Sequence, residues 1–506
     1  MNQKTSIVLS FFLLIFFCFQ ADLYPQNRNV FPRIEPDPKA LEYYNIGREN
    51  DYSWEQLAEI SLWASGNTTP NNIERIRAAV IALNNSPELP DSDREKAEFI
   101  LTYMHRNFLR TYMLYQTRID TIFTNGSYNC VSSAALYIIL CESAGIRTSG
   151  VMTREHAFVI VHIDGQDIDV ETTNRYGFEP GNRREFHDQF GRLTGFSYVP
   201  AQNYRARQTI TKIELISLIL NNRIGDVERR NNFSDAVPLA VDRAALLLGN
   251  SLSVSAEAYS SEYLFADPRK DLMDRLINYG AALLRTNREE DGLRWAVLAS
   301  SVYPDTERWQ DFLLTAANNR IARFIRERKQ TDARNFLENN KIHLTETIYD
   351  QLDKIVIDAE LLNRANHIAN AAEGNTILAD IEHARDNGKM NDGRASELIT
   401  FTIQKTAAVL CAAPTAGSSG GRDWRAAIRY IENAISVYGI NRELEQNLRT
   451  YRGNLATDYH NRFAAEWNRR NYDEAERILN EGLEEFPDNR QLLNNRQTVN
   501  RHRARQ

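Results

Sequence analysis

Residues 128–146 read YNCVSSAALYIILCESAGI, and this stretch decides how the rest of the chain is interpreted. Asn129 is a favourable helix N-cap, an apolar run follows it, and Gly145 is a typical residue at a helix end. The predicted helix is apolar on nearly every side, which indicates that it is buried. Cys130 is its first residue and therefore lies at the N-terminal end of a buried helix.

A β-hairpin is predicted shortly after this helix. Residues 156–163 (HAFVIVHI) and 166–173 (QDIDVETT) are rich in β-branched residues and flank Asp164 and Gly165. Asp-Gly between two such runs is among the strongest hairpin signals. A buried helix followed by strands indicates an α+β core.

The register of that hairpin brings a histidine and a carboxylate together. With a two-residue turn, the ladder runs on through Phe158–Glu171 to His156–Thr173. Diagonal neighbours in a sheet lie about 7–8 Å apart, within reach of long side chains. Glu171 is thus predicted to meet His156. Asp169 lies one pair further away and remains the alternative acid, which a longer loop or a β-bulge would favour.

Cys130, His156 and Glu171 are the three groups that a cysteine hydrolase needs: a thiolate, a base that takes its proton, and an acid that orients the base. The helix N-terminus favours a negatively charged sulfur, and its backbone N–H groups can hold the oxyanion formed during attack on a carbonyl. Gln116 and Tyr128 are candidates for the second oxyanion donor.

Three motifs in this order, YNCVSSAALYIILCESAGI, REHAFVIV and DIDVETTN, resemble the transglutaminase-like superfamily. In that superfamily a helix-start Cys, a strand His and an acid after the next strand lie in a papain-like arrangement. Its common last motif reads V-D-P-T, whereas this chain has Val170-Glu171-Thr172-Thr173, so the acid position holds a glutamate. The resemblance covers about residues 95–200.

The resemblance implies an enzyme that acts on amide bonds of protein or peptide substrates through Cys130, His156 and Glu171. Water as the acceptor would make it a peptidase or amidase, and an amine would make it an acyltransferase. The alternative is a catalytically inactive transglutaminase-like scaffold for protein interaction.

Composition excludes several other functions. The 60 basic and 67 acidic residues give a net charge of −7, without the basic excess of nucleic-acid-binding proteins. No histidines and cysteines have zinc-ligand spacing, so neither a metal nor a cofactor is expected. After residue 25 no apolar run is long enough to span a membrane. The few cysteines do not form a disulfide framework.

The first residues predict export. Lys4 precedes an apolar run from Ile7 to Phe19, and Ala21 follows closely. This is the pattern of a secretory signal peptide, predicted over residues 1–21, which implies a periplasmic or extracellular protein. A helix of this run reaches only about 20 Å, which is short of the roughly 30 Å hydrocarbon core. An uncleaved anchor is the alternative.

The C-terminal part is predicted to be all-helical. Three segments share small or turn residues at offsets of seven and twelve, as in the second helix of tetratricopeptide repeats: Gly292, Ala299 and Pro304; Ala427, Ala434 and Gly439; Ala475, Gly482 and Pro487. Such helical hairpins suggest a surface for a protein partner. Residues 412–423 (AAPTAGSSGGRD) are predicted to form a loop, and residues 210–506 are expected to fold independently.

The predicted organisation therefore has four parts. They are a signal peptide (1–21), a lead-in with helices (22–94), a transglutaminase-like α+β core (95–205) and an all-α, tetratricopeptide-like region of helical hairpins (206–506).

Overall fold

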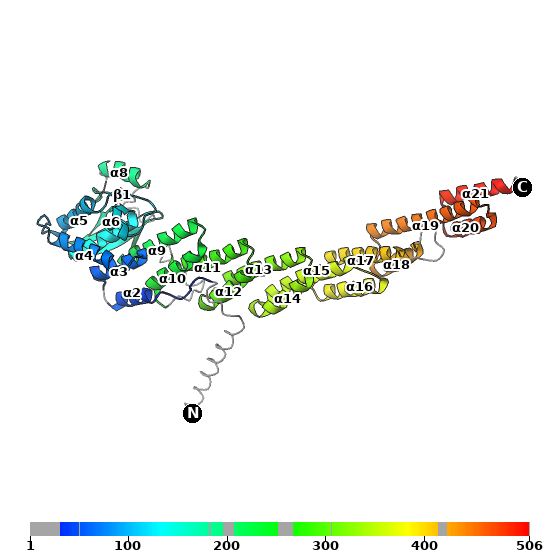
Figure 1. The fold of residues 1–506 in the computed structure, drawn as a ribbon, viewed down its shortest axis with the longest axis horizontal. Helices are drawn as coiled ribbons and strands as arrows, with labels where there is room; N and C mark the ends of the chain where they lie inside the picture. The colour runs from blue at the N-terminus through cyan, green and yellow to red at the C-terminus, as the bar shows by residue number, and fades with distance from the viewer. Residues whose placement is uncertain are drawn as a thin grey trace, which may run out of the picture. The chain divides into compact units, whose positions relative to one another are not determined.

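The computed structural model describes residues 31–49, 51–181, 184–195, 207–250, 267–304, 306–412 and 422–504. The chain divides into two compact units, Met1–Phe312 and Leu313–Gln506. The predicted signal peptide and most of the predicted loop at 412–423 lie outside the described residues. The broad expectation of an α+β region followed by helices is confirmed (Figure 1).

The first half of unit 1 consists of short helices around one very apolar helix, α7. In chain order the helices are α2 (Pro38–Glu49), α3 (Trp54–Ser65), α4 (Pro70–Asn84), α5 (Asp93–Asn107), α6 (Asp120–Asn125) and α7 (Cys130–Ser143). α3, α4 and α5 all pack on α7. Twelve residues of α7, from Cys130 to Cys141, are buried, as its sequence predicts.

Side chains cap the starts of α3, α5 and α7, and the cap at Asn129 was predicted from the sequence. Ser53 forms a full capping box with Gln56, and Asn129 caps α7 through the backbone N–H groups that follow it. Ser92 caps α5, but the Glu95 carboxylate accepts the Ser92 hydroxyl at 2.6 Å rather than the backbone N–H of Ser92. Each cap satisfies donors that the first helical turn leaves without partners.

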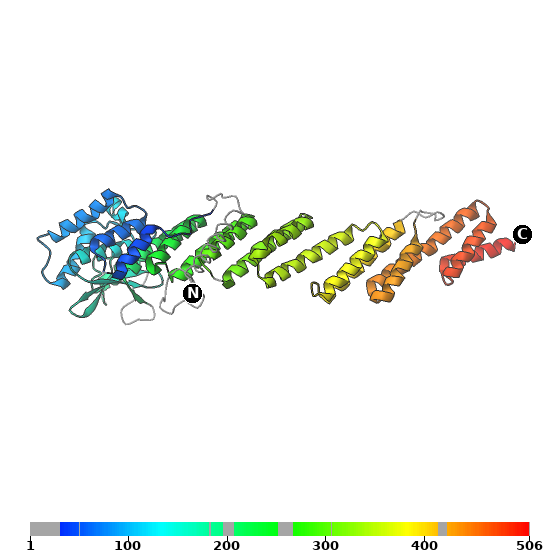
Figure 2. The same cartoon turned by 90° about the horizontal axis from the view of Figure 1, so that it is seen from below.

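A four-stranded antiparallel sheet, in the order β5-β4-β3-β6, packs against α7 and α9. Its strands are β3 (Thr148–Met152), β4 (Ala157–Ile163), β5 (Gln166–Val170) and β6 (Gln208–Ile210). Figure 2 shows these strands on one side of the helices of this unit. A separate two-stranded parallel ladder joins β1 (Thr111–Tyr112) to β2 (Ser127–Tyr128), just before α7.

The hairpin turn is as predicted, but the hairpin is shorter than expected. Ile163 pairs with Gln166, and Asp164 and Gly165 both have positive φ, as a two-residue turn requires. The expected pairs Phe158–Glu171 and His156–Thr173 do not form, because the β4–β5 ladder ends at Val159↔Val170. Beyond it the chain leaves the sheet, and the Glu171 N–H donates to the carbonyl of Gly177.

The core of unit 1 extends past residue 205. β6 lies inside the segment expected to be all-helical, and it pairs with β3. Helix α9 (Lys212–Arg229) packs on α3 and α7, and its residues Leu215, Ile216 and Ile219 belong to the same hydrophobic core as α7. In this structure residues 210–506 are not a separate unit, because α9 shares the core of α7 and the boundary follows Phe312. Their independent folding stays a prediction from the sequence.

Helices fill the rest of unit 1. α8 (Arg184–Thr194) lies between β5 and β6 in the chain. After α9 come α10 (Phe233–Leu248), α11 (Pro268–Arg285) and α12 (Glu289–Val302), each packed on the one before it. α13 (Thr306–Arg326) begins in unit 1 and ends in unit 2.

In unit 2 the described residues form helices only. They are α14 (Gln330–Asn340), a 3₁₀ turn (Lys341–His343), α15 (Glu346–Asn366), α16 (Ala371–Asp386), α17 (Asp392–Ala412), α18 (Trp424–Tyr438), α19 (Arg442–Asn468), α20 (Tyr472–Glu485) and α21 (Arg490–Arg503). Each of these α-helices packs on the next one in the sequence, as in helical hairpins.

The small residues of the repeat-like pattern lie where helices meet. The first two of each triplet fall inside α12, α18 and α20, and all six are buried. A Cβ at Gly482 would lie 3.0 Å from the Tyr459 ring of α19. The pattern therefore predicted close helix packing correctly, because only small side chains allow such an approach.

Candidate active site

Cys130 occupies the first position of α7 and is 7% exposed. The Asn129 side-chain oxygen accepts the N–H groups of Val131 and Ser132 at 3.1 and 3.0 Å. The Cys130 N–H itself has no acceptor among the described residues. The first turn thus leaves one backbone donor next to the sulfur, at the positive end of the helix dipole.

His156 lies immediately before β4 and is 6% exposed. Thr153 holds its backbone: the Thr153 hydroxyl accepts the His156 N–H, and the His156 carbonyl accepts the Thr153 N–H at 2.8 Å. The imidazole Nε2 lies 2.6 Å from Glu171 Oε2. The ring of Phe190, from α8, packs edge-on against the imidazole with ring centroids 5.1 Å apart.

The charges around His156 strongly favour its protonated form. Burial alone would lower the pKa of the imidazole, but Glu171 and the Cys130 side chain outweigh it and raise the pKa to about 10. His156 is therefore coupled electrostatically to both Cys130 and Glu171.

Glu171 is completely buried, and both of its carboxylate oxygens have partners. Oε2 contacts His156, while Oε1 accepts the N–H and the hydroxyl of Thr173 at 3.1 and 2.8 Å. A tight loop over residues 171–177 holds the backbone here, and it needs a glycine at its end. A Cβ on Gly177 would lie only 2.0 Å from the Glu171 carbonyl oxygen.

Asp169, the alternative acid, is engaged elsewhere. Both of its carboxylate oxygens accept hydrogen bonds from the Arg207 guanidinium, at 2.7 and 2.9 Å. The guanidinium also lies over the Phe158 ring, 4.9 Å from its centroid. Of the two carboxylates that the sequence left open, Glu171 is the one in contact with His156.

A second group of residues, which sequence reasoning missed, holds the chain next to Glu171. The Thr172 hydroxyl shares a hydrogen bond of 2.9 Å with Ser133, and its carbonyl lies 3.1 Å from His105 Nε2. Burial lowers the pKa of His105 to about 4, so at neutral pH its neutral ring donates to that carbonyl. His105 lies in the last turn of α5, and nothing in the sequence indicated this contact.

The two residues proposed from sequence as oxyanion donors lie nearby in different settings. The Tyr128 hydroxyl donates to the Thr173 carbonyl at 3.3 Å and therefore helps to hold the Glu171 loop. The Gln116 carbonyl accepts a hydrogen bond from Ser132, which ties its loop to α7. Neither contact directs a side-chain donor at Cys130.

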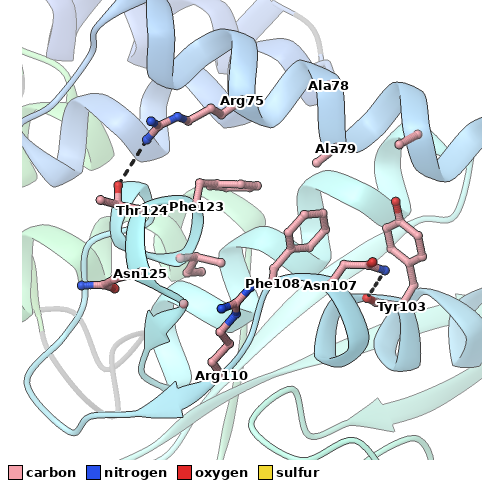
Figure 3. Close-up of a pocket in the computed structure, with 13 residues that line it drawn as sticks. Arg75, Ala78, Ala79, Tyr103, Asn107, Phe108, Arg110, Phe123, Thr124 and Asn125 are labelled. Atoms are coloured by element: carbon pink, nitrogen blue, oxygen red, sulfur yellow. Dashed lines mark hydrogen bonds between the residues drawn. The ribbon is translucent and has the colours of Figure 1, made fainter.

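A cavity of about 490 Å³ lies between α4, α5 and α6 (Figure 3). Arg75 points across it to the Thr124 hydroxyl, and Phe108, Phe123 and Arg110 form other parts of its wall. Cys130, His156 and Glu171 are not among its lining residues. The cavity is therefore separate from the candidate active site.

The other described cysteines, Cys141 and Cys411, are buried and form no disulfide. Burial raises the pKa of the Cys141 thiol far above its usual value, so Cys141 lacks the environment of a nucleophile. Within the described ranges no group of three or more His, Cys, Asp or Glu side chains is placed to hold a metal ion.

Comparison of the chain with protein-family models and with curated proteins gave no match. None of the helices in the described residues is long and apolar enough to cross a membrane.

Proposed function

We propose that this chain is a transglutaminase-like cysteine enzyme that acts on amide bonds of protein or peptide substrates. One observation carries the proposal: a buried His156–Glu171 pair at 2.6 Å is coupled to Cys130 at a helix N-terminus. Glu171 is the orienting acid and Asp169 is not. The motif resemblance supports the same assignment.

In this mechanism Cys130 is the nucleophile and His156 carries the proton. Nε2 faces Glu171, so the proton passes between the sulfur and Nδ1. The thiolate attacks the carbonyl carbon, and the electron pair of the C=O bond moves to oxygen. When this intermediate collapses, the amine leaves with the proton of the imidazolium, and a thioester remains. Water or an amine then attacks the thioester, and His156 accepts the proton of the attacking group.

The predicted export signal supports an enzyme that works outside the cytoplasm. Disulfides form readily there, so a cysteine that stays free, as Cys130 does, is expected to be buried or to have a chemical role. The helical region would then hold a protein partner or substrate. The competing proposal is an inactive scaffold that kept the core for binding. The two proposals differ in one measurable property, the reactivity of Cys130.

The test is alkylation of the folded protein by iodoacetamide at pH 7, with the modified cysteine identified by mass spectrometry. We expect Cys130 to react much faster than Cys141, which serves as an internal control because its thiol is buried and protonated. Glu171→Gln should slow the Cys130 reaction by roughly 100-fold or more, because the imidazolium loses the charge that stabilises it.

Asp169→Asn is the matched control. It removes a partly buried carboxylate two residues away but leaves the His156–Glu171 contact in place, so the alkylation rate should change little. It should instead lower stability by about 3–5 kcal/mol, because the buried Arg207 guanidinium loses the charge that accepts two of its hydrogen bonds. An unreactive Cys130 in folded wild-type protein would favour the scaffold. Loss of reactivity in Asp169→Asn alone would reverse the assignment of the acid.

A further inference from the structure

The Tyr112 side chain ends in a buried hydroxyl that has no hydrogen-bond partner among the described residues. Burying a hydroxyl without a partner costs about 1–3 kcal/mol in proteins. Such a group is therefore a candidate for a partner that arrives only with a ligand or during a reaction.

The β1–β2 ladder places Tyr112 beside the start of α7. Tyr112 pairs with Tyr128, and the following amide, that of Met113, donates to the Tyr128 carbonyl at 2.8 Å. The two tyrosine rings pack edge to face, with centroids 5.8 Å apart and planes at 82°. Tyr128 is followed by the cap Asn129 and then by Cys130, so a fixed ladder joins Tyr112 to the nucleophile.

The electrostatic surroundings of Tyr112 are those of the candidate active site. Burial raises the pKa of its hydroxyl well above the ordinary value of 10, and the charges of Cys130 and Glu171 raise it further. The hydroxyl therefore keeps its proton at physiological pH. It remains a hydrogen-bond donor while negative charge develops nearby.

We propose that Tyr112 is the second oxyanion donor of this site, acting together with the backbone N–H of Cys130. This inference rests on the proposed function. Tyr112 takes the place of Gln116 and Tyr128, the two donors proposed from the sequence. The Tyr128 hydroxyl is already bonded to the Thr173 carbonyl. When the thiolate attacks, the C=O electron pair moves to oxygen, and the Tyr112 hydroxyl donates a hydrogen bond to that oxygen without giving up its proton.

The test uses two reagents that differ in whether an oxyanion forms. p-Nitrophenyl acetate acylates a thiol through a tetrahedral oxyanion and releases p-nitrophenolate. Iodoacetamide alkylates the same thiol by displacement at a saturated carbon, with no oxyanion. Both rates are measured on the full chain, after subtraction of the Cys130→Ser background, for wild type and for Tyr112→Phe.

Tyr112→Phe should slow acylation by roughly 100-fold, the usual effect of removing one oxyanion donor. Alkylation should stay within about twofold, because its transition state does not use that donor. The melting temperature should stay the same or rise, since the variant removes a hydroxyl without a partner. Tyr115→Phe, which alters an exposed tyrosine three residues later, is the matched control and should change neither rate.

Each other outcome points to a different conclusion. Equal acylation rates in wild type and Tyr112→Phe would overturn the role of Tyr112 and leave the proposed enzyme intact. An equal fall in both rates, or a lower melting temperature, would also overturn it and assign Tyr112 a structural role. A wild-type Cys130 that reacts with iodoacetamide but not with the ester would reject an oxyanion site. A Cys130 that reacts with neither reagent would reject the proposed function as well.

Discussion

At the residue scale, the site depends on how two nearby carboxylates are used. Asp169 and Glu171 are two positions apart, yet one binds Arg207 in two hydrogen bonds and the other binds His156 in one. An arginine fork matches a carboxylate that can offer both oxygens. Glu171 instead divides its oxygens between His156 and Thr173, which orients the imidazole with Nε2 toward the carboxylate.

The raised pKa of His156 predicts a pH dependence of stability. Its ordinary value of 6.5 rises to about 10 in the folded chain, in part through Glu171. The stabilisation from this pair is therefore complete below pH 6.5 and is lost as the pH rises through 10. Glu171→Gln should lower the melting temperature of unit 1 by several degrees at pH 6 and by much less near pH 10. For a domain of this size, each kcal/mol of lost stability lowers the melting temperature by roughly 2–4 °C.

Thermal unfolding of wild type and Glu171→Gln, followed by circular dichroism at both pH values, checks this prediction. Thr173→Val is a useful comparison, because it removes a hydrogen bond to Glu171 without removing the charge. The change in melting temperature caused by Thr173→Val should not depend on pH in the same way. If Glu171→Gln lowered the melting temperature equally at pH 6 and pH 10, the ionic origin of the stabilisation would be contradicted.

At the element scale, the position of Glu171 depends more on the loop after β5 than on the strand itself. The predicted ladder would have paired Glu171 with Phe158 and made it the diagonal neighbour of His156, whereas the ladder ends at Val170. The loop then closes through the Glu171 N–H to the Gly177 carbonyl. The Glu171 side chain therefore contacts His156 from a loop. The hydrogen bonds of that loop, rather than pairing between strands, set its position.

The close approach of Gly177 to Glu171 predicts the effect of a single methyl group. In Gly177→Ala the new Cβ would meet the Glu171 carbonyl oxygen, so the loop must move. A displacement of about 1 Å at a catalytic group can cost roughly 100-fold in rate. We expect Cys130 alkylation by iodoacetamide to slow by about 10- to 100-fold.

Gly225→Ala is the matched control for that substitution. Gly225 lies within α9, and the nearest atom to a new Cβ is the end of the Arg229 side chain at 3.8 Å. Alanine there should leave the alkylation rate unchanged and raise helix stability by up to about 1 kcal/mol. If Gly177→Ala reacted as fast as wild type, the loop would not be what positions Glu171.

At the scale of the whole molecule, the boundary between the two units does not coincide with the end of the last described strand. That strand, β6, ends at Ile210, whereas unit 1 continues to Phe312. α9 is a helix like those after it, yet its apolar face completes the core around α7. We therefore expect a fragment of residues 313–506 to fold independently and a fragment of residues 210–506 to expose the α9 face. The first should be monomeric, with a helical circular-dichroism spectrum and cooperative unfolding.

The longer fragment should self-associate and bind a hydrophobic dye, because about 25 cal/mol per Å² of exposed apolar surface favours association. Size-exclusion chromatography with light scattering measures both fragments at the same concentration. A monomeric, dye-free fragment of residues 210–506 would show that α9 belongs with the later helices. A disordered fragment of residues 313–506 would show that unit 2 depends on unit 1.

The sequence by itself determined the features that depend on neighbours in the chain. Asn129 caps α7, Asp164 and Gly165 turn the hairpin, and small residues mark where helices pack. These signals are readable because caps, turns and periodic faces act within a few residues. The candidate triad of Cys130, His156 and Glu171 could be proposed from local signals of the same kind.

Only the tertiary structure decided which distant groups meet. Arg207 binds Asp169 from 38 residues away, and His105 contacts the Thr172 carbonyl from 67 residues away. A two-residue ladder pairs Tyr112 with Tyr128, two positions before Cys130. Strands that short have no measurable alternation, and the partners of a buried polar group are set by packing rather than by spacing. The contact between His156 and Glu171 could therefore be predicted from the sequence, but the contacts that support it could not.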